Sequence, residues 1–368
     1  MIKIMTVFGT RPEAIKMLPI VKEIEKHQEK FKGITVVTGQ HREMLDQVLS
    51  VFEVKPDYDL ALMNKNQTLA DITIGIITEL DSILMIEQPD IILVHGDTTT
   101  TFAASLSAFY HQIPIGHVEA GLRTWDKYSP FPEEMNRQLT DVLSDFYFAP
   151  TNISKENLLK ENHRADRIFV TGNTVIDALS YSITPDYTHE ILTKLNTDHK
   201  FILLTMHRRE NQGQPMVNVF LAIKQLVERH PEFEVVFPVH LSPKVQSIAE
   251  QYLADVERVH LIEPLNMVDF HNLAARSYLI LTDSGGVQEE APSLQKPVLV
   301  LRQETERPEG VAAGTLKIIG TETENVLLET EKLILDPQAY DEMATAKNPY
   351  GDGHSSARIL TIIEENFT

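Results

Sequence analysis

Short apolar runs alternate with helical patterns along almost the whole sequence, and this alternation limits the folds that the chain can adopt. Runs such as Ile2–Phe8, Ile34–Thr38 and Ile91–Val94 are each followed by apolar residues at helical spacing. Within the first helical pattern, Pro19 is expected to kink the helix or restart it. Hairpin signals between neighbouring runs are missing, so successive strands must be joined by crossovers. The sequence therefore predicts an α/β fold with parallel sheets.

The alternation is interrupted once, and this interruption predicts two domains. Residues 181–199 contain Pro185 and several polar residues, as a connection between domains would. A second series of apolar runs begins at Phe201 and resembles the first in size. With 368 residues the chain is long enough to bury two separate cores. We therefore expect two doubly wound, Rossmann-like halves.

Composition narrows the classes of function. The formal net charge of −20 argues against a nucleic-acid or anionic-membrane surface, because phosphate contacts need clustered Lys and Arg. The absence of cysteine excludes disulfides, thiolate metal sites and cysteine nucleophiles, and it fits a reducing compartment. The first apolar run is too short for a signal peptide, and no stretch approaches the roughly 18 apolar residues of a membrane span. We expect a cytoplasmic protein.

Most of the candidate chemistry lies directly after predicted strands, which is where open parallel sheets bind ligands. The turn Asp283–Gly286 predicts a phosphate cradle, because its glycines let backbone N–H groups approach a ligand at a helix start. A plain tight turn explains these four residues equally well. His207, Arg208 and Arg209 place three cationic groups after a buried strand, which requires an anion or carboxylates nearby. Ion pairing within the protein is the competing interpretation.

The stretch His117–Arg137 is dense in charge and contains two prolines, so a folding argument alone explains it poorly. A solvated loop with surface ion pairs is the simplest alternative to a functional role. His117 and Glu119 share one face of a strand, but no third ligand at a suitable spacing accompanies them. Asp57 and Asp59 have the spacing of an acidic metal motif, yet they follow Pro56 in a predicted turn. We expect no metal ion and no redox cofactor.

Six motifs occur in a fixed order along almost the whole chain. They are Phe8–Lys16, His95–Thr101, His117–Thr124, Pro132–Arg137, His207–Asn211 and Asp283–Ala291. Together they closely resemble the non-hydrolysing UDP-N-acetylglucosamine 2-epimerases of bacteria. The resemblance implies a fold like that of the two-domain glycosyltransferases of the B type, with a central cleft, and a homodimer. It also implies a sugar-side domain at 1–180, a UDP-binding domain at 181–353, and a C-terminal helix at 354–368 that packs back on the first domain.

The reaction implied by the resemblance is the reversible conversion of UDP-GlcNAc to UDP-ManNAc. UDP is eliminated to leave a 2-acetamidoglucal and is then added back, without a cofactor, supplying ManNAc for cell-wall or surface polysaccharide such as teichoic acid or capsule. Which residue removes the C2 proton stays open. The resemblance assigns acid, base or charge-stabilising roles to Asp97, Glu119, Glu133 and His207. It assigns contacts with UDP or the sugar to Arg11, Lys16, Arg137, Arg208, His240, Phe270, Ser284, Gly285, Gly286 and Glu290.

Some bacterial members of this family bind a second UDP-GlcNAc as an allosteric activator. Gln40 and His41 fit that pattern, together with Glu133, Arg208 and His240. Glu43 and Asn66 depart from it, because the family pattern has Gln and Arg at these two places. The exchange removes a cation and adds an acid beside a phosphate-bearing ligand, which costs about 1–3 kcal/mol for one lost charged hydrogen bond.

Three other functions compete with epimerisation. A glycosyltransferase of the B type would also bind a UDP-sugar, but it would not need several acids around C2. A hydrolysing epimerase would release free ManNAc and UDP. A non-catalytic sensor of nucleotide sugars is disfavoured, because all four candidate catalytic residues are present.

Overall fold

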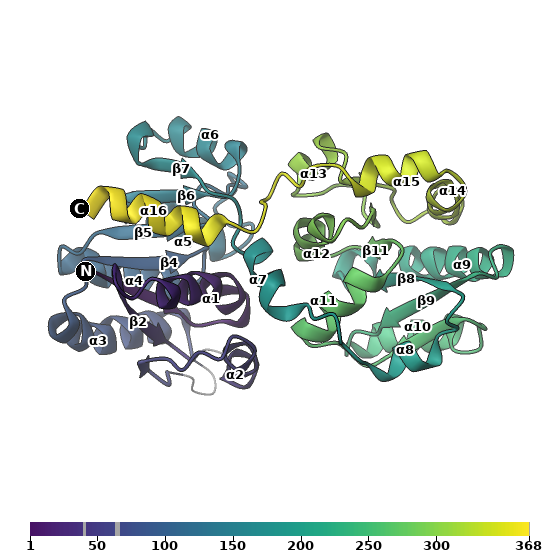
Figure 1. The fold of residues 1–368 in the computed structure, drawn as a ribbon, viewed down its shortest axis with the longest axis horizontal. Helices are drawn as coiled ribbons and strands as arrows, with labels where there is room; N and C mark the ends of the chain where they lie inside the picture. Colours follow the sequence, from purple (N-terminus) through teal and green to yellow (C-terminus); the bar gives the residue numbers. More distant parts are fainter. Residues whose placement is uncertain (40–41, 63–66, 368) are drawn as a thin grey trace. The chain divides into compact units, whose positions relative to one another are not determined.

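The computed structural model describes residues 1–39, 42–62 and 67–367, with the backbone alone at 42 and 43. Two compact units make up the chain (Figure 1). The first unit combines Met1–Tyr181 with the C-terminal segment from Tyr350 onward, and the second is Ser182–Pro349. Each unit contains one parallel sheet with its own core, so the predicted α/β class with two parallel-sheet domains is confirmed.

The sheet of the first unit has seven strands in the order β3-β2-β1-β4-β5-β6-β7. The chain runs outward in one direction from β1 and then in the other from β4, as in Rossmann folds. Parallel pairing joins every neighbouring pair of these strands. The strands are β1 (Ile2–Phe8), β2 (Phe31–Val37), β3 (Tyr58–Asp59), β4 (Ile91–His95), β5 (Ile115–Val118), β6 (Phe146–Ala149) and β7 (Ile168–Val170).

Helices cover the first sheet and bury its apolar side chains. Met5, Val36 and Ile92 form one core with residues of α3 and α4. The C-terminal helix α16 packs against α1, as Figure 1 shows. The helices are α1 (Arg11–Lys26), α2 (Arg42–Val51), α3 (Leu69–Glu87), α4 (Thr99–Tyr110), α5 (Glu133–Leu143), α6 (Asn152–Lys160), α7 (Val175–Ser182) and α16 (Ser355–Phe367).

The second unit repeats the same topology with six strands, in the order β10-β9-β8-β11-β12-β13. Its strands are β8 (Lys200–Thr205), β9 (Phe233–Pro238), β10 (Val259–Ile262), β11 (Ile280–Thr282), β12 (Val298–Val300) and β13 (Leu316–Ile318). Alternate residues of β8 belong to two separate cores, Ile202 to one and Leu203 to the other. Side chains of a strand point alternately to its two faces, so this sheet is buried on both sides.

Eight helices of the described chain belong to the second unit. They are α8 (Glu190–Lys194), α9 (Gln214–Arg229), α10 (Pro243–Leu253), α11 (Met267–Arg276), α12 (Gly285–Glu290), α13 (Pro308–Ala312), α14 (Thr323–Leu335) and α15 (Pro337–Ala344). None of the helices in the described ranges of either unit is long and apolar enough to cross a membrane.

Helix α1 runs as one element through Pro19, so of the two expected effects of this proline the restart does not occur. A second local expectation was wrong. Residues 58–59 form the short strand β3 rather than a turn. Two hydrogen bonds with β2 explain the strand: the Asp57 carboxylate accepts from the Thr35 amide at 2.7 Å, and the Asp57 amide donates to the Thr35 carbonyl at 2.9 Å.

One buried carboxylate joins the turns that follow β1 and β4. The Glu13 side chain accepts hydrogen bonds from the backbone amides of Gly9, at 3.1 Å, and Thr10, at 2.7 Å. Its other oxygen accepts from the hydroxyls of Thr98, at 2.7 Å, and Thr101, at 3.2 Å. Because β1 and β4 are the strands at which the order reverses, Glu13 fixes both turns at the place where such sheets bind ligands.

Gly9 lies where only glycine fits. A Cβ atom at this position would lie 2.0 Å from the Thr38 hydroxyl oxygen and 2.7 Å from that of Thr100. These two hydroxyls are themselves 3.1 Å apart and hydrogen-bonded. The turn after β1 is therefore packed tightly against the ends of two neighbouring elements, which sets the direction in which α1 leaves the sheet.

Candidate active site

Glu119 occupies the turn directly after β5 and holds a strained backbone conformation. Its φ angle is 66°, in the left-handed region that side chains other than Gly rarely adopt. The carboxylate forms an ion pair with Lys16 of α1 and accepts a hydrogen bond from the Asn173 amide at 3.0 Å. The His95 ring nitrogen Nε2 lies 3.6 Å away. Four segments distant in sequence thus meet at one carboxylate.

The surroundings of Glu119 decide its charge state. Its side chain is only 11% exposed, and this burial by itself would raise the pKa of the carboxyl group. The positive charge of Lys16, with His95 as a second contributor, outweighs burial and holds the pKa well below its ordinary value of 4.5. Glu119 is therefore ionised throughout the neutral range.

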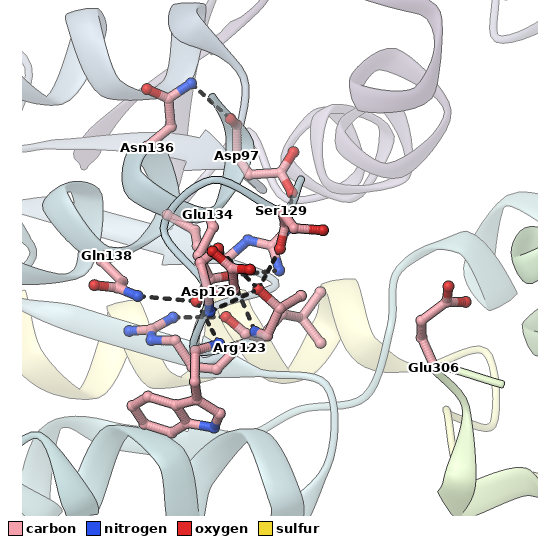
Figure 2. A network of polar contacts seen from close by, with 12 residues as sticks. Asp97, Arg123, Asp126, Ser129, Glu134, Asn136, Gln138 and Glu306 are labelled. Carbon is pink, nitrogen blue, oxygen red and sulfur yellow. Dashed lines mark hydrogen bonds and ion pairs between the residues drawn. The ribbon is translucent and has the colours of Figure 1, made fainter. Parts of the chain in front are cut away.

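Asp97 follows β4 and is tied to the start of α5. Its carboxylate forms an ion pair with Arg137, and its backbone carbonyl accepts from the Asn136 side chain at 2.9 Å, as Figure 2 shows for Asn136. Glu133 is the first residue of the same helix and is partly exposed. No described residue forms an ion pair with Glu133. The first unit thus places Asp97 and Glu119 after the paired strands β4 and β5, and Glu133 at the start of α5, the helix that Asn136 joins to Asp97.

The neighbouring glutamate, Glu134, has a different role. It is fully buried, and its carboxylate accepts from the backbone amides of Thr124 and Trp125, each at 3.0 Å (Figure 2). It also lies 3.3 Å from an Arg137 nitrogen and accepts from the Gln138 side chain at 2.9 Å. Glu134 therefore holds the loop before α5 against the helix that carries Glu133.

In the second unit, a single buried carboxylate organises the turn after β8. Asp283 has no exposed surface and accepts from the backbone amides of His207, at 3.0 Å, and Arg208, at 2.9 Å. The Asn211 side chain donates to it at 2.9 Å, and the His207 ring lies 3.3 Å from it. Burial would raise the pKa of Asp283, but these hydrogen bonds and His207 lower it below its usual range.

The turn after β11 lies beside two guanidinium groups. A Cβ atom at Gly285 would lie 3.7 Å from an Arg208 nitrogen and 3.9 Å from an Arg307 nitrogen. Arg208 contacts Glu306 at 3.5 Å, and Arg307 forms an ion pair with Glu289. Gly285 is therefore flanked by the guanidinium groups of Arg208 and Arg307, each of which contacts a glutamate.

Three further residues of the second unit that are predicted to contact the nucleotide lie in the loop after β9, on α11 and on α12. The His240 ring stacks on that of His207, with centroids 5.5 Å apart and planes inclined by 19°. The Glu290 carboxylate accepts from Nε2 of buried His271 at 3.1 Å, and Nδ1 of that histidine also bonds the Ser182 hydroxyl at 2.7 Å. Phe270 is half-buried on α11 and packs on the adjacent core.

Arg11 begins α1 and Ser284 directly precedes α12, so each lies at a helix start beside a strand end. Gly286 is the second residue of α12 and is exposed. Of the predicted activator residues, Gln40, His41 and Asn66 lie outside the described part of the chain, as does the side chain of Glu43. Among the described residues, no group of three or more His, Asp or Glu side chains has the geometry of a metal site.

Several residues of these clusters escaped the sequence analysis. His95, Asn173 and Glu134 were not assigned a role, although His95 is the last residue of β4, where ligand-binding residues are expected. Asp283 was included only in the predicted phosphate-binding turn and not as the acceptor for the turn after β8. Arg123 was also unassigned. Its side chain is fully buried and bonds Asp141 and Glu161. The alternative of a solvated loop with surface ion pairs therefore fails at this arginine.

Comparisons with known proteins agree over the full length. Residues 22–364 match a protein family described as UDP-N-acetylglucosamine 2-epimerase. A UDP-N-acetylglucosamine 2-epimerase of Bacillus subtilis is 60% identical, over 98% of this chain and 94% of the relative. A crystal structure of a putative UDP-N-acetylglucosamine 2-epimerase from Listeria monocytogenes is 55% identical, with a TM-score of 0.96, and covers 100% of this chain and 96% of its own. A Neisseria meningitidis UDP-GlcNAc 2-epimerase bound to UDP-GlcNAc has 52% identity, a TM-score of 0.85 and coverage of 99% and 100%.

Proposed function

The chain belongs to the family of non-hydrolysing UDP-N-acetylglucosamine 2-epimerases and epimerises that nucleotide sugar at C2, and we propose that the residues described above do so by eliminating UDP and adding it back. A C2 proton is a very weak acid, so it leaves with or after the UDP anion. Departure of UDP gives the sugar ring positive character, which nearby carboxylates stabilise. The observation that carries the proposal is the placement of Asp97 and Glu119, each paired with a cation, after the neighbouring strands β4 and β5, with Glu133 at the start of α5.

We further propose a division of work between the two units. In the first unit, Asp97, Glu119 and Glu133 act on the sugar. In the second, His207 with Arg208 and the turn at Ser284–Gly286 bind the diphosphate through cations and backbone amides. His240 and Glu290 contact the rest of the nucleotide, and Phe270 stacks on the uracil. Arg11, Lys16 and Arg137 add positive charge, which a protein of net charge −20 needs wherever it binds a dianion.

The decisive experiment measures proton exchange at C2. Elimination in deuterated water places deuterium at C2 of both recovered UDP-GlcNAc and UDP-ManNAc. We expect Glu119→Gln to lower turnover by about 100- to 10,000-fold, because it removes a group that acts in the transition state. UDP affinity should change by less than about threefold.

Controls separate this reaction from its competitors. Turnover without deuterium at C2 would overturn the elimination mechanism. Free ManNAc among the products would indicate a hydrolysing enzyme, and transfer of the sugar to an acceptor would indicate a glycosyltransferase. Loss of UDP binding in Glu119→Gln would show that the catalytic assignment is wrong, while Glu156→Gln, on the exposed face of α6, serves as the matched control.

The ion pair between Lys16 and Glu119 gives the enzyme a testable pH dependence. A carboxylate with so low a pKa is a weak base, so we propose that Lys16 moves toward the diphosphate of the substrate and leaves Glu119 more basic. The substitution Lys16→Met removes the positive charge that lowers the pKa of Glu119, while the burial that raises this pKa remains. The pKa of Glu119 in the free enzyme should therefore rise.

The acid limb of kcat/KM reports the essential base of the free enzyme. In the unaltered chain Glu119 loses its negative charge only well below pH 4.5, so this limb lies at low pH. We expect the limb to move upward in Lys16→Met, with rates falling as the pH drops through the raised pKa. If the acid limb of kcat/KM stays at the same pH in Lys16→Met and only the maximum value falls, Lys16 does not control the pKa of Glu119.

We propose that activation by a second UDP-GlcNAc is weak in this chain. Glu43 and Asn66 stand where the family pattern has Gln and Arg, so the activator would lose a cation and face an added acid. Initial rates with UDP-ManNAc should therefore rise less than about tenfold on adding a small amount of UDP-GlcNAc, the factor that corresponds to about 1.4 kcal/mol. Glu43→Gln combined with Asn66→Arg should strengthen the activation. A strictly UDP-GlcNAc-dependent reverse reaction in the unaltered chain would contradict this expectation.

We also propose a homodimer that forms through the first unit. Large apolar side chains are exposed at the C-terminal ends of three helices that neighbour one another, α3, α4 and α5. They are Met85, Ile86, Phe109, Tyr110 and Val142, each between 55% and 73% exposed. Monomeric proteins rarely expose so many large apolar groups together, so we expect a second copy of the chain to cover them.

The dimer is tested by light scattering at several concentrations. Val142→Glu places a charge in the proposed interface and should raise the dissociation constant by at least about tenfold. Leu328→Glu, at a residue that is 62% exposed on α14 of the second unit, is the matched control and should leave the dimer intact. A monomeric unaltered chain, or equal effects of both substitutions, would refute this interface.

A further inference from the structure

His117 uses both of its ring nitrogens and has no exposed surface. It lies on β5, two residues before Glu119. Its Nδ1 atom is 2.6 Å from Oδ1 of Asp141, and its Nε2 atom is 2.7 Å from the backbone carbonyl oxygen of Gly96. Both distances are those of strong hydrogen bonds, so each nitrogen has one defined partner.

These two partners define the protonation state of the ring. A carbonyl oxygen only accepts, so Nε2 must donate to Gly96. Asp141 also accepts, because its second oxygen receives a hydrogen bond from the Arg123 guanidinium at 2.5 Å. Burial would raise the pKa of Asp141, but the lasting positive charge of Arg123, which bonds this carboxyl group directly, acts in the opposite direction and keeps it ionised. An ionised carboxylate only accepts, so Nδ1 must donate as well. A neutral imidazole carries only one N–H, so the geometry requires an imidazolium.

Charge balance makes a buried imidazolium tolerable. Arg123 contacts both Asp141 and Glu161, and its guanidinium nitrogen lies 2.5 Å from an oxygen of each. The network therefore contains two cations, His117 and Arg123, and two anions, Asp141 and Glu161. Buried charges are costly unless they are paired and hydrogen-bonded, and each member of this network has an opposite partner within hydrogen-bonding distance.

The carbonyl that accepts from His117 belongs to Gly96, which lies in the turn after β4. Gly96 directly precedes Asp97 and lies close to Glu119. Gly96 has a φ angle of 69°, and a Cβ atom there would lie 3.9 Å from a Glu119 carboxylate oxygen. In a trans peptide the carbonyl and the next N–H point in opposite directions. With the Gly96 carbonyl directed at His117, the amide of Asp97 faces away from the ring. The orientation of this one peptide therefore sets where the Asp97 backbone lies.

We propose that His117, held as an imidazolium by Asp141, is the positioning residue that fixes the Gly96–Asp97 peptide and with it the Asp97 carboxylate. The inference rests on the proposed catalytic role of Asp97. A charged donor binds a carbonyl more strongly than a neutral one does, so the charge of the ring is part of its role. The Asn136 side chain donates to the Asp97 carbonyl at 2.9 Å, so the carbonyls of Gly96 and Asp97 each have a separate donor.

Nitrogen NMR of the full chain with labelled histidine tests the protonation state without reference to activity. At neutral pH both nitrogens of His117 should give imidazolium signals, assigned by their loss in His117→Gln. In Asp141→Asn the ring should become neutral and keep its N–H toward Gly96, because an amide can donate to Nδ1. A neutral His117 in the unaltered chain would overturn the proposal.

Kinetics then separate positioning from simple stability. His117→Gln should lower kcat by about 100-fold with little change in KM, because a displaced catalytic group costs rate more than binding. Asp141→Asn, which preserves the hydrogen bond but not the charge, should lower kcat by about tenfold. His230→Gln, which removes a 3.2 Å contact with Glu331 in the second unit, is the control and should leave kcat unchanged.

An equal fall of kcat in His230→Gln, or a change of KM without a change of kcat in His117→Gln, would show that His117 is only structural.

The protonation state of His117 can be judged separately from the proposed elimination mechanism. If the unaltered chain fails to exchange the C2 proton while His117 gives imidazolium signals, the elimination mechanism fails and the protonation state stands. If exchange occurs but His117 is neutral, this inference fails alone.

Discussion

The turns after β1 and β8 hold backbone amides in buried or partly buried positions, where they need acceptors other than bulk water. Glu13 meets this requirement in the first unit, where its two oxygens join the turns after β1 and β4. Asp283 does the same in the second unit for the turn that begins at His207. An unsatisfied buried amide costs about 1–3 kcal/mol, so a buried carboxylate that satisfies two of them determines the shape of the whole turn.

Glu13 and Asp283 also determine which residues lie beside the candidate catalytic groups. Lys16 lies one helical turn after Glu13, so the residue that anchors α1 also brings a cation to Glu119. Asp283 places the His207 backbone and also contacts its ring. In each unit a buried carboxylate, Glu13 or Asp283, accepts hydrogen bonds from a turn. The residue with the proposed chemistry, Asp97 or His207, lies in such a turn and is more exposed.

The sequence was sufficient to predict the two parallel sheets and the strand ends at which chemistry gathers, because both depend on local periodicity. It could not predict which residues pair, since Lys16 and Glu119 are 103 positions apart and meet only when the sheet forms. The adjacent acids Glu133 and Glu134 illustrate the limit. Their side chains differ in burial because of the helical phase at the start of α5, and no capping signal in the sequence marks that phase. Arg123 received no role from the sequence, because its partners Asp141 and Glu161 lie 18 and 38 positions away and come together only in the folded chain.

Helix α16 belongs to the first unit although it ends the chain. The second unit is therefore an insertion within the first, attached to it through the peptide links near residues 181 and 350. A single proteolytic cut at either link leaves the two units covalently joined through the other. Truncation at residue 350 would remove a helix that packs on α1, so the early and late parts of the polypeptide must both be synthesised before the first domain is complete.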